Sequence, residues 1–232
     1  MTKPPAPHFF TEEASRHYDE RNARLAPISA CMHFLIQLAL QELPVKSHIL
    51  CIGVGTGAEV LTLAKAFPAW TFVGVDPSAP MLEVCRQRLA DAGISDRCQL
   101  IHGYVRDVPG GENFDAALGV LVGHFVPRAE KADFFGNMVR RLKDGGTLVN
   151  TEISFDLDSP EFPAMMKNWG RVQTLMGATP ESLEKLPQQM REMLDIFPPE
   201  ETEELLRRCG VHQPLRVFQA FMICGWVGQK RT

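Results

Sequence analysis

Short apolar runs alternate with amphipathic segments through the middle of the chain. Between most of these runs, apolar residues recur at spacings of three and four, the period of a helix. Strands that alternate with helices are typical of a parallel sheet, because each right-handed crossover carries the chain back to the start of the next strand. The runs that predict strands are residues 49–52, 71–75, 99–101, 114–120 and 147–153.

Two helical segments are predicted before this core. Residues 11–25 are charged, and Thr11 can act as the N-cap of a first helix. Pro27 then opens a second helix, in which apolar residues share one face from residue 28 to residue 43. Pro44 is expected to end it, since proline cannot continue a helix.

The alternation stops after residue 153. Residues 154–197 carry Met, Trp and Gln at helical spacing among several prolines, and they predict an inserted helical lid. Residues 198–209 predict a last helix. Two apolar runs, 215–218 and 221–227, have a very short connection, which predicts an antiparallel hairpin at the sheet edge.

Composition narrows the class of function. The 232-residue chain has a net charge of -4 and a pI near 6.0, so affinity based on phosphate neutralisation, and nucleic acid as a partner, are not expected. No apolar stretch reaches about 18 residues, which predicts no membrane span, and no secretory signal is visible. Six cysteines without a C-x-x-C pair favour buried thiols in a reducing, cytoplasmic compartment. No spacing indicates a metal site.

A glycine-rich turn links the first predicted strand to a helix. Gly53, Gly55 and Gly57 form a G-x-G-x-G motif, which a ligand's polar backbone can approach closely because no Cβ blocks it. Asp76 lies 19 residues after Gly57 at the end of the next strand, where a carboxylate can accept hydrogen bonds from ribose hydroxyls. The alternatives are a ligand-free turn and, for Asp76, a helix-capping role that suits Ser78 better.

This loop and acid resemble the signature of class I S-adenosylmethionine-dependent methyltransferases. Residues 114–118 resemble the family's F-D-x-V segment, and residues 142–148 resemble its L-x-P-G-G-x-L turn. The resemblance implies a Rossmann-like, seven-stranded, mostly parallel sheet with a C-terminal antiparallel hairpin, helices on both faces and a helical insertion after strand five. The fingerprint of dinucleotide-dependent oxidoreductases fits the glycine spacing poorly.

We therefore expect a single domain over residues 1–232. Its parts are the N-terminal helices (1–48), the cofactor-binding core (49–153), the lid insertion (154–197), and the last helix with the hairpin (198–232).

The resemblance implies S-adenosyl-L-methionine as cofactor and S-adenosyl-L-homocysteine as product. The chain departs from the family at two positions: Cys51 stands where an acid usually precedes the first glycine, and Tyr104 stands where an acid usually follows strand three. A tyrosine can stack on adenine. The cofactor-binding residues that the resemblance implies are Tyr18, Cys51, Gly53, Gly55, Thr56, Gly57, Asp76, Pro77, Met81, Tyr104, Val105, Val120 and Leu121.

Three segments resemble the carboxy-S-adenosylmethionine synthase branch more narrowly: residues 18–21, 76–83 and 210–230. In that branch an arginine of the helical insertion binds the carboxylate of the modified cofactor. Arg191 takes the matching position here, and the alternative is a surface arginine on a charged helix.

His124 follows the fourth predicted strand, at the edge where such a sheet opens toward ligands. A neutral histidine there can accept a proton from an attacking nucleophile, or it can order the loop and cover the adenine. Tyr18 and Arg21 can form a lid over the cofactor, or they can belong to a solvated helix. Trp169 can line an apolar substrate pocket, or it can be a core residue.

These patterns predict a methyltransferase that acts on a small-molecule acceptor. Methyl transfer from an activated sulfonium depends mainly on proximity and orientation, so an enzyme needs no obvious base. Two alternatives stay open: an enzyme that makes or uses carboxy-S-adenosylmethionine, and a protein that binds the cofactor or a partner without turnover, because Cys51 and Tyr104 replace acids. The apolar first helices and the insertion can also form a homodimer interface.

Overall fold

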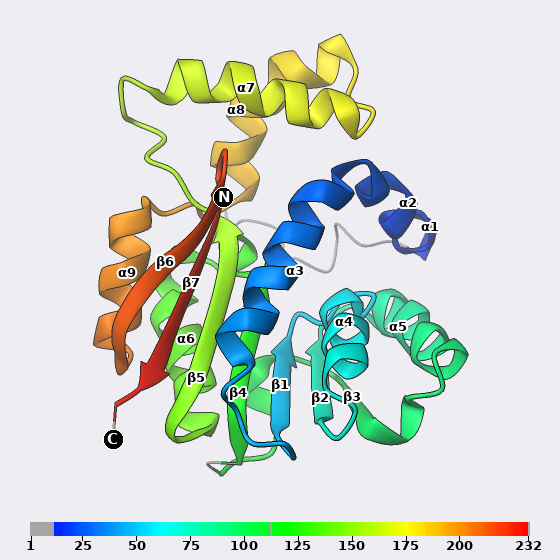
Figure 1. The fold of residues 1–232 in the computed structure, drawn as a ribbon. Coiled ribbons are helices and arrows are strands. Elements are labelled where there is room, and N and C mark those ends of the chain that lie inside the picture. Colours follow the sequence, from blue (N-terminus) through cyan, green and yellow to red (C-terminus); the bar gives the residue numbers. More distant parts are fainter. Residues whose placement is uncertain (1–11, 112, 232) are drawn as a thin grey trace.

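The protein is built on one seven-stranded sheet, seen in a computed structural model that describes residues 12–111 and 113–231 (Figure 1). The strand order is β3-β2-β1-β4-β5-β7-β6, with β1 to β5 parallel and the β6–β7 hairpin antiparallel at one edge. This confirms the predicted fold class. The strands are β1 (His48–Ile52), β2 (Thr71–Asp76), β3 (Cys98–His102), β4 (Phe114–Val120), β5 (Leu142–Ile153), β6 (Val211–Ala220) and β7 (Ile223–Lys230).

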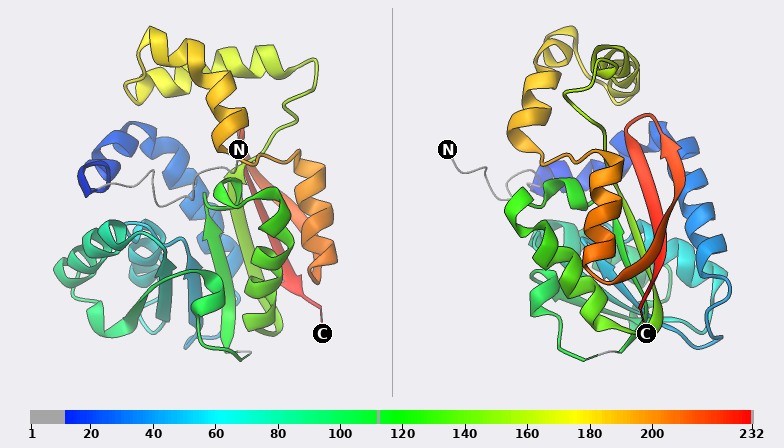
Figure 2. Two further views of the ribbon diagram at one scale, coloured as in Figure 1. Left: turned by 180° about the vertical axis from the view of Figure 1, so that it is seen from behind. Right: turned by 90° about the vertical axis from the view of Figure 1, so that its left-hand side faces the viewer.

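Helices cover both faces of the sheet (Figure 2). Helices α3, α4 and α5 pack on one face, and α6 and α9 pack on the other, so the apolar core forms two layers. The α-helices are α1 (Glu12–Arg16), α2 (Tyr18–Asn22), α3 (Ala26–Leu40), α4 (Ala58–Ala66), α5 (Ala79–Asp91), α6 (Lys131–Arg141), α7 (Phe162–Leu175), α8 (Pro180–Met193) and α9 (Pro199–Arg208). Short 3-10 turns include η2 (Ala23–Leu25), η4 (Val105–Asp107) and η5 (Gly123–Phe125).

The N-terminal segment differs from the single helix predicted before Pro27. It consists of α1, α2 and η2, and α3 then starts at Ala26 and ends at Leu40. The early end of α3 agrees with the bias of residues before Pro44 against helical backbone. Thr11, the predicted N-cap, lies outside the described residues.

The hairpin is longer than its apolar runs predicted. Strand β6 already pairs with β7 at Val211, and the ladder shifts register between His212 and Leu215, where Gln213 has a positive φ of 42°. Pro214 lies in this irregular stretch and donates no hydrogen bond. The irregularity explains why residues 211–214 do not show a strand pattern.

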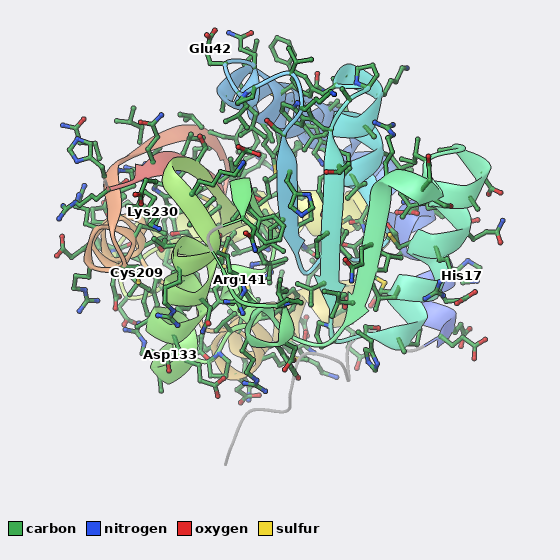
Figure 3. All side chains as sticks on the ribbon, turned by 90° about the horizontal axis from the view of Figure 1, so that it is seen from below. His17, Glu42, Asp133, Arg141, Cys209 and Lys230 are labelled. Carbon is green, nitrogen blue, oxygen red and sulfur yellow. The ribbon has the colours of Figure 1, made fainter. Side chains whose placement is uncertain are left out.

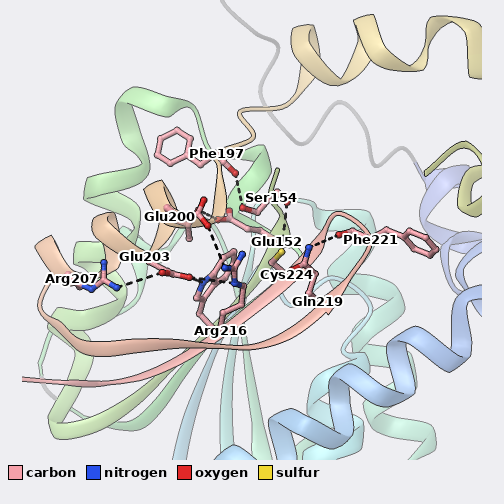
Figure 4. Close-up of polar contacts among 12 residues, drawn as sticks. Glu152, Ser154, Phe197, Glu200, Glu203, Arg207, Arg216, Gln219, Phe221 and Cys224 are labelled. Atoms are coloured by element: carbon pink, nitrogen blue, oxygen red, sulfur yellow. Dashed lines mark hydrogen bonds and ion pairs between the residues drawn. The ribbon is translucent and has the colours of Figure 1, made fainter. Parts of the chain in front are cut away.

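The insertion of residues 154–197 forms α7 and α8, which stand beyond the carboxyl ends of the parallel strands (Figure 1). Its two ends are joined at the base, because Ser154 Oγ donates to Phe197 O at 2.7 Å and Phe155 N donates to the same oxygen at 3.1 Å (Figure 4). On its other side, Arg24 Nη1 of η2 donates to Leu175 O of α7 at 3.4 Å. The insertion and the N-terminal helices therefore meet over the same end of the sheet.

One stretch among the described residues, Tyr18–Leu40, is long and apolar enough to cross a membrane by length and composition alone. The apolar core helix of a soluble protein passes the same test, so the finding is weak evidence for a span. Phe34 and Leu38 on α3 are exposed apolar side chains, and the homodimer stays a prediction.

Candidate cofactor site

The glycine loop between β1 and α4 has backbone that only glycine adopts easily. Gly53 has φ 63° and Gly57, at the N-cap of α4, has φ 80°. A Cβ on Gly53 would lie 2.4 Å from Val122 Cγ2, and a Cβ on Gly57 would lie 2.7 Å from Cys85 Sγ. Space and conformation thus both require glycine at these two positions.

Asp76, at the end of β2, is fixed by main-chain donors. Its Oδ2 accepts from Gly55 N at 2.9 Å, and its Oδ1 accepts from Ser78 N at 2.8 Å. Burial raises the pKa of Asp76, and these two hydrogen bonds oppose the rise. A carboxylate has about four acceptor positions, so it can still accept from two ribose hydroxyls. Ser78, as expected, is the N-cap of α5, with its Oγ accepting from Met81 N at 3.4 Å.

The N-terminal helix α2 is tied onto the glycine loop. Thr56 Oγ1 donates to Asp19 Oδ1 at 2.9 Å, and Arg88 Nη1 of α5 donates to Asp19 Oδ2 at 2.8 Å and to Thr56 O at 3.0 Å. This three-residue cluster, which we call the loop clamp, was not singled out from the sequence. It places Tyr18 beside the loop, where burial and then the carboxylates of Glu59, Asp19 and Asp76 raise the tyrosine's pKa.

The turn after β3 forms the side of the site where an adenine ring is expected. Tyr104 is partly exposed, and the Arg106 guanidinium lies 4.7 Å from its ring centroid. Arg141 of α6 holds this turn by donating from Nη2 to Val108 O at 2.6 Å and to Arg106 O at 3.1 Å (Figure 3). Val105 is buried beneath the turn.

The chain makes a sharp turn after β4, beside the glycine loop. Leu121 has a positive φ of 57°, and its N–H donates to Thr151 O at 2.7 Å. Left-handed backbone in a bulky residue costs about 1–3 kcal/mol and persists where the surroundings enforce it. Val120 precedes it at the end of the strand, and Val122 reaches Gly53.

His124 lies in this turn and is buried. Its Nδ1 accepts from Ile153 N at 3.2 Å, and its carbonyl accepts from Asp195 N at 2.9 Å. Burial, and secondly Lys131, lower the pKa of His124 to about 3. With Nδ1 used as acceptor, the neutral ring carries its proton on Nε2. This geometry favours the loop-ordering role over proton acceptance, and the catalytic role stays a prediction.

The contacts of the Arg191 side chain lie within the insertion. Its Nη1 donates to Asp158 Oδ1 at 2.9 Å, its Nη2 donates to Leu157 O, and the guanidinium lies 5.2 Å from the Phe162 ring. These contacts join α8 to the first residue of α7 and to the residues before it, and none of them involves the glycine loop. The assignment of Arg191 to a cofactor carboxylate stays a prediction.

The remaining predicted residues lie around the glycine loop. Met81 packs under it, since its Cε would lie 3.4 Å from a Cβ on Gly55. Pro77 O contacts His102 Nε2 at 3.0 Å at the ends of β2 and β3. Cys51 is fully buried on β1. The described residues hold no cluster of His, Cys, Asp or Glu that fits a metal ion.

Sequence reasoning also missed Glu59, on the first turn of α4. Its side chain is only 6% exposed although it is charged. A signal was present, because Glu59 shares a helix face with Leu63, four residues later, and that face is apolar.

A hollow between two helices of the insertion lies away from the glycine loop. A groove of about 520 Å³ runs between α7 and α8, with Met166, Leu183 and Leu186 among its apolar lining and Lys167 and Arg171 at its polar side. It includes no residue of the glycine loop, so it is not the cofactor site.

Part of the chain is similar to a known family and to known proteins. Residues 49–146 match the family described as Methyltransferase domain. A demethylmenaquinone methyltransferase of Lactiplantibacillus plantarum is 30% identical over 66% of this chain, and the chain spans 63% of that relative's length.

Solved structures agree on the fold. An S-adenosyl-L-methionine-dependent methyltransferase from Methanococcus maripaludis is 19% identical and superposes with a TM-score of 0.66, covering 100% of this chain and 98% of that one. PigF with SAH has the same TM-score, 0.66, and 19% identity, over 95% of this chain and 60% of that one. Neither the relatives nor the structures confirm the carboxy-S-adenosylmethionine synthase branch. Residues 49–146 thus match the methyltransferase domain family, and the chain as a whole has the fold of S-adenosylmethionine-dependent methyltransferases.

Proposed function

We propose that this protein transfers a methyl group from S-adenosylmethionine to a small, largely apolar acceptor. The observation that carries the proposal is the glycine loop next to the Asp76 carboxylate, inside a matched methyltransferase domain. When bound, the cofactor supplies an activated methyl group on a sulfonium. The chain's residues fit it: the glycine loop would hold its amino-acid part, Asp76 would accept from the ribose hydroxyls, and the Tyr104 ring would stack on the adenine.

The insertion supports an apolar acceptor. Apolar side chains of residues 154–197 belong to the same core layer as Cys51 and Val54 of the loop region, so the insertion brings apolar surface to this end of the sheet. The members from the insertion include Phe155, Leu157, Met165, Met166, Trp169, Met176 and Met190. The L. plantarum relative is named for a demethylmenaquinone acceptor, and an apolar acceptor here agrees with that name. The role left to the protein is to hold the acceptor atom in line with the methyl–sulfur bond and to exclude water.

The test is a methyl-transfer assay with labelled S-adenosylmethionine and a panel of reduced naphthoquinones, phenols and short-chain sterols. We expect a product heavier by one methyl group with the wild type and none with Asp76→Ala. Calorimetric titration with S-adenosylhomocysteine runs in parallel. Binding of the cofactor product without methylation of any acceptor on the panel would contradict the proposal and favour a protein that binds without turnover.

A further inference from the structure

The carboxyl of Glu59 is buried next to the glycine loop. The side chain is only 6% exposed, and its own main-chain N–H is the one hydrogen-bond donor that the described residues offer it. Among the described residues, none forms an ion pair with Glu59. Leaving a carboxyl in this state costs stability unless a ligand or a proton compensates it.

Glu59 lies in the first turn of α4, directly after the glycine loop, and its electrostatic partners include residues of the candidate cofactor site. Asp76 lies at the end of β2 and Tyr18 on α2, and both interact electrostatically with Glu59. Cys51, on β1, does the same from the position where the family usually carries an acid. The titratable groups that face Glu59 are Tyr18, Cys51, Asp76, Cys85, Arg88 and Cys98.

Arg88 is the one cation in this set, and it is already engaged. Its Nη1 donates to Asp19 and to Thr56 in the loop clamp. Arg88 acts to lower the pKa of Glu59, but it makes no ion pair with Glu59 in the described part of the chain, so a cationic ligand group can supply that pairing.

We propose that Glu59 binds the α-ammonium of the cofactor's methionine moiety, in place of the acid that is absent at Cys51. This inference rests on the cofactor assignment above. The acid then stands on the helix after the loop (α4) and not on the strand before it (β1), and both positions flank the same loop.

Proton release follows from this arrangement. Burial raises the pKa of Glu59 from 4.5 to about 8, so the carboxyl is mostly protonated at pH 7 without ligand. An ammonium binds the ionised form, so binding at pH 7 releases the proton from Glu59 to the buffer. The expected release from Glu59 is about 0.9 proton per ligand at pH 7.

The experiment is calorimetric titration with two ligands, in buffers of different ionisation enthalpy. S-adenosylhomocysteine carries the ammonium, and 5′-methylthioadenosine lacks the whole amino-acid part. In Glu59→Gln we expect S-adenosylhomocysteine to bind about 10- to 100-fold more weakly, without proton release, and methylthioadenosine to bind as in the wild type. The control for the same chemical change on an exposed site is Glu42→Gln.

A second variant tests the exchange of positions. The double variant C51D/E59Q returns the acid to the strand, and it should recover most of the affinity for S-adenosylhomocysteine. Equal weakening of both ligands in Glu59→Gln would make Glu59 a structural residue and overturn the proposal, as would unchanged binding of both. A wild type that binds neither ligand would instead overturn the cofactor assignment itself.

Discussion

Replacing Lys131 by methionine removes one half of a buried ion pair. Lys131 and Glu152 are each 1% exposed, with Lys131 Nζ 3.4 Å from Glu152 Oε2. Nζ also donates to Gly123 O at 2.5 Å and lies 4.7 Å from the Phe197 ring centroid. This lysine thus joins the turn after β4, strand β5 and the base of the insertion.

The expected loss follows from the charge that remains. In Lys131→Met, the Glu152 carboxylate stays buried with Thr202 Oγ1, which donates to its Oε1 at 2.9 Å. Breaking a buried pair from one side costs about 3–5 kcal/mol in free energy of unfolding, because an uncompensated charge is left inside. For a domain of this size the melting temperature should fall by about 6–20 °C. Affinity for S-adenosylhomocysteine should fall too, since the turn next to Gly53 loses its anchor.

Urea unfolding and calorimetry measure both effects. Lys185→Met, which breaks an exposed pair with Glu181, is the control and should change the free energy of unfolding by less than about 0.5 kcal/mol. The double variant K131M/E152Q should recover part of the loss, because it also removes the buried charge. A loss below about 1 kcal/mol in Lys131→Met, or a deeper loss in the double variant, would refute this reasoning.

Three further predictions concern backbone and protonation. Gly57→Ala should destabilise the protein by about 1–3 kcal/mol in urea unfolding, because its φ is 80° and its Cβ would meet a thiol at 2.7 Å, whereas Gly93→Ala, with φ 66° and open space, should cost less. Gly123→Ala should lower both the melting temperature and the affinity for S-adenosylhomocysteine, because its Cβ would lie 2.0 Å from Glu152 Oε2. The free energy of unfolding without ligand should fall between about pH 4.5 and 8, the range in which the folded chain keeps a proton on Glu59 that the unfolded chain has lost, and Glu59→Gln should flatten that slope.

Local patterns predicted most of the fold. Strands β1, β2 and β4 are buried apolar runs, and turn-forming residues follow each of them in the sequence. The break of the N-terminal segment into α1, α2 and η2 depends instead on contacts with α5 and the glycine loop, which lie far away in the sequence. The bulge at Gln213 is likewise set by pairing with β7.

For the site, too, local sequence motifs were predicted and long-range contacts were not. Asp76 and the glycines were predicted because the motif is local and its spacing is short. The loop clamp was not, since Asp19 contacts Thr56 and Arg88 across 37 and 69 residues of sequence. Neither was the pair of Lys131 and Glu152, because charged residues on a helix and at a strand end are usually solvent-exposed.

Glu59 changes the interpretation of Cys51, the residue that departs from the family pattern. Cys51 alone suggests a weakened cofactor site, because a thiol whose pKa is raised by burial carries no charge for an ammonium. Glu59 offers a carboxyl to the same loop from the helix, where burial raises its pKa to about 8. An acid with that pKa holds a proton until a cation binds, so a cysteine at position 51 in place of an acid need not reduce affinity near pH 8. It makes affinity depend on pH: binding of S-adenosylhomocysteine should strengthen as pH rises toward 8, and C51D/E59Q should lose that dependence.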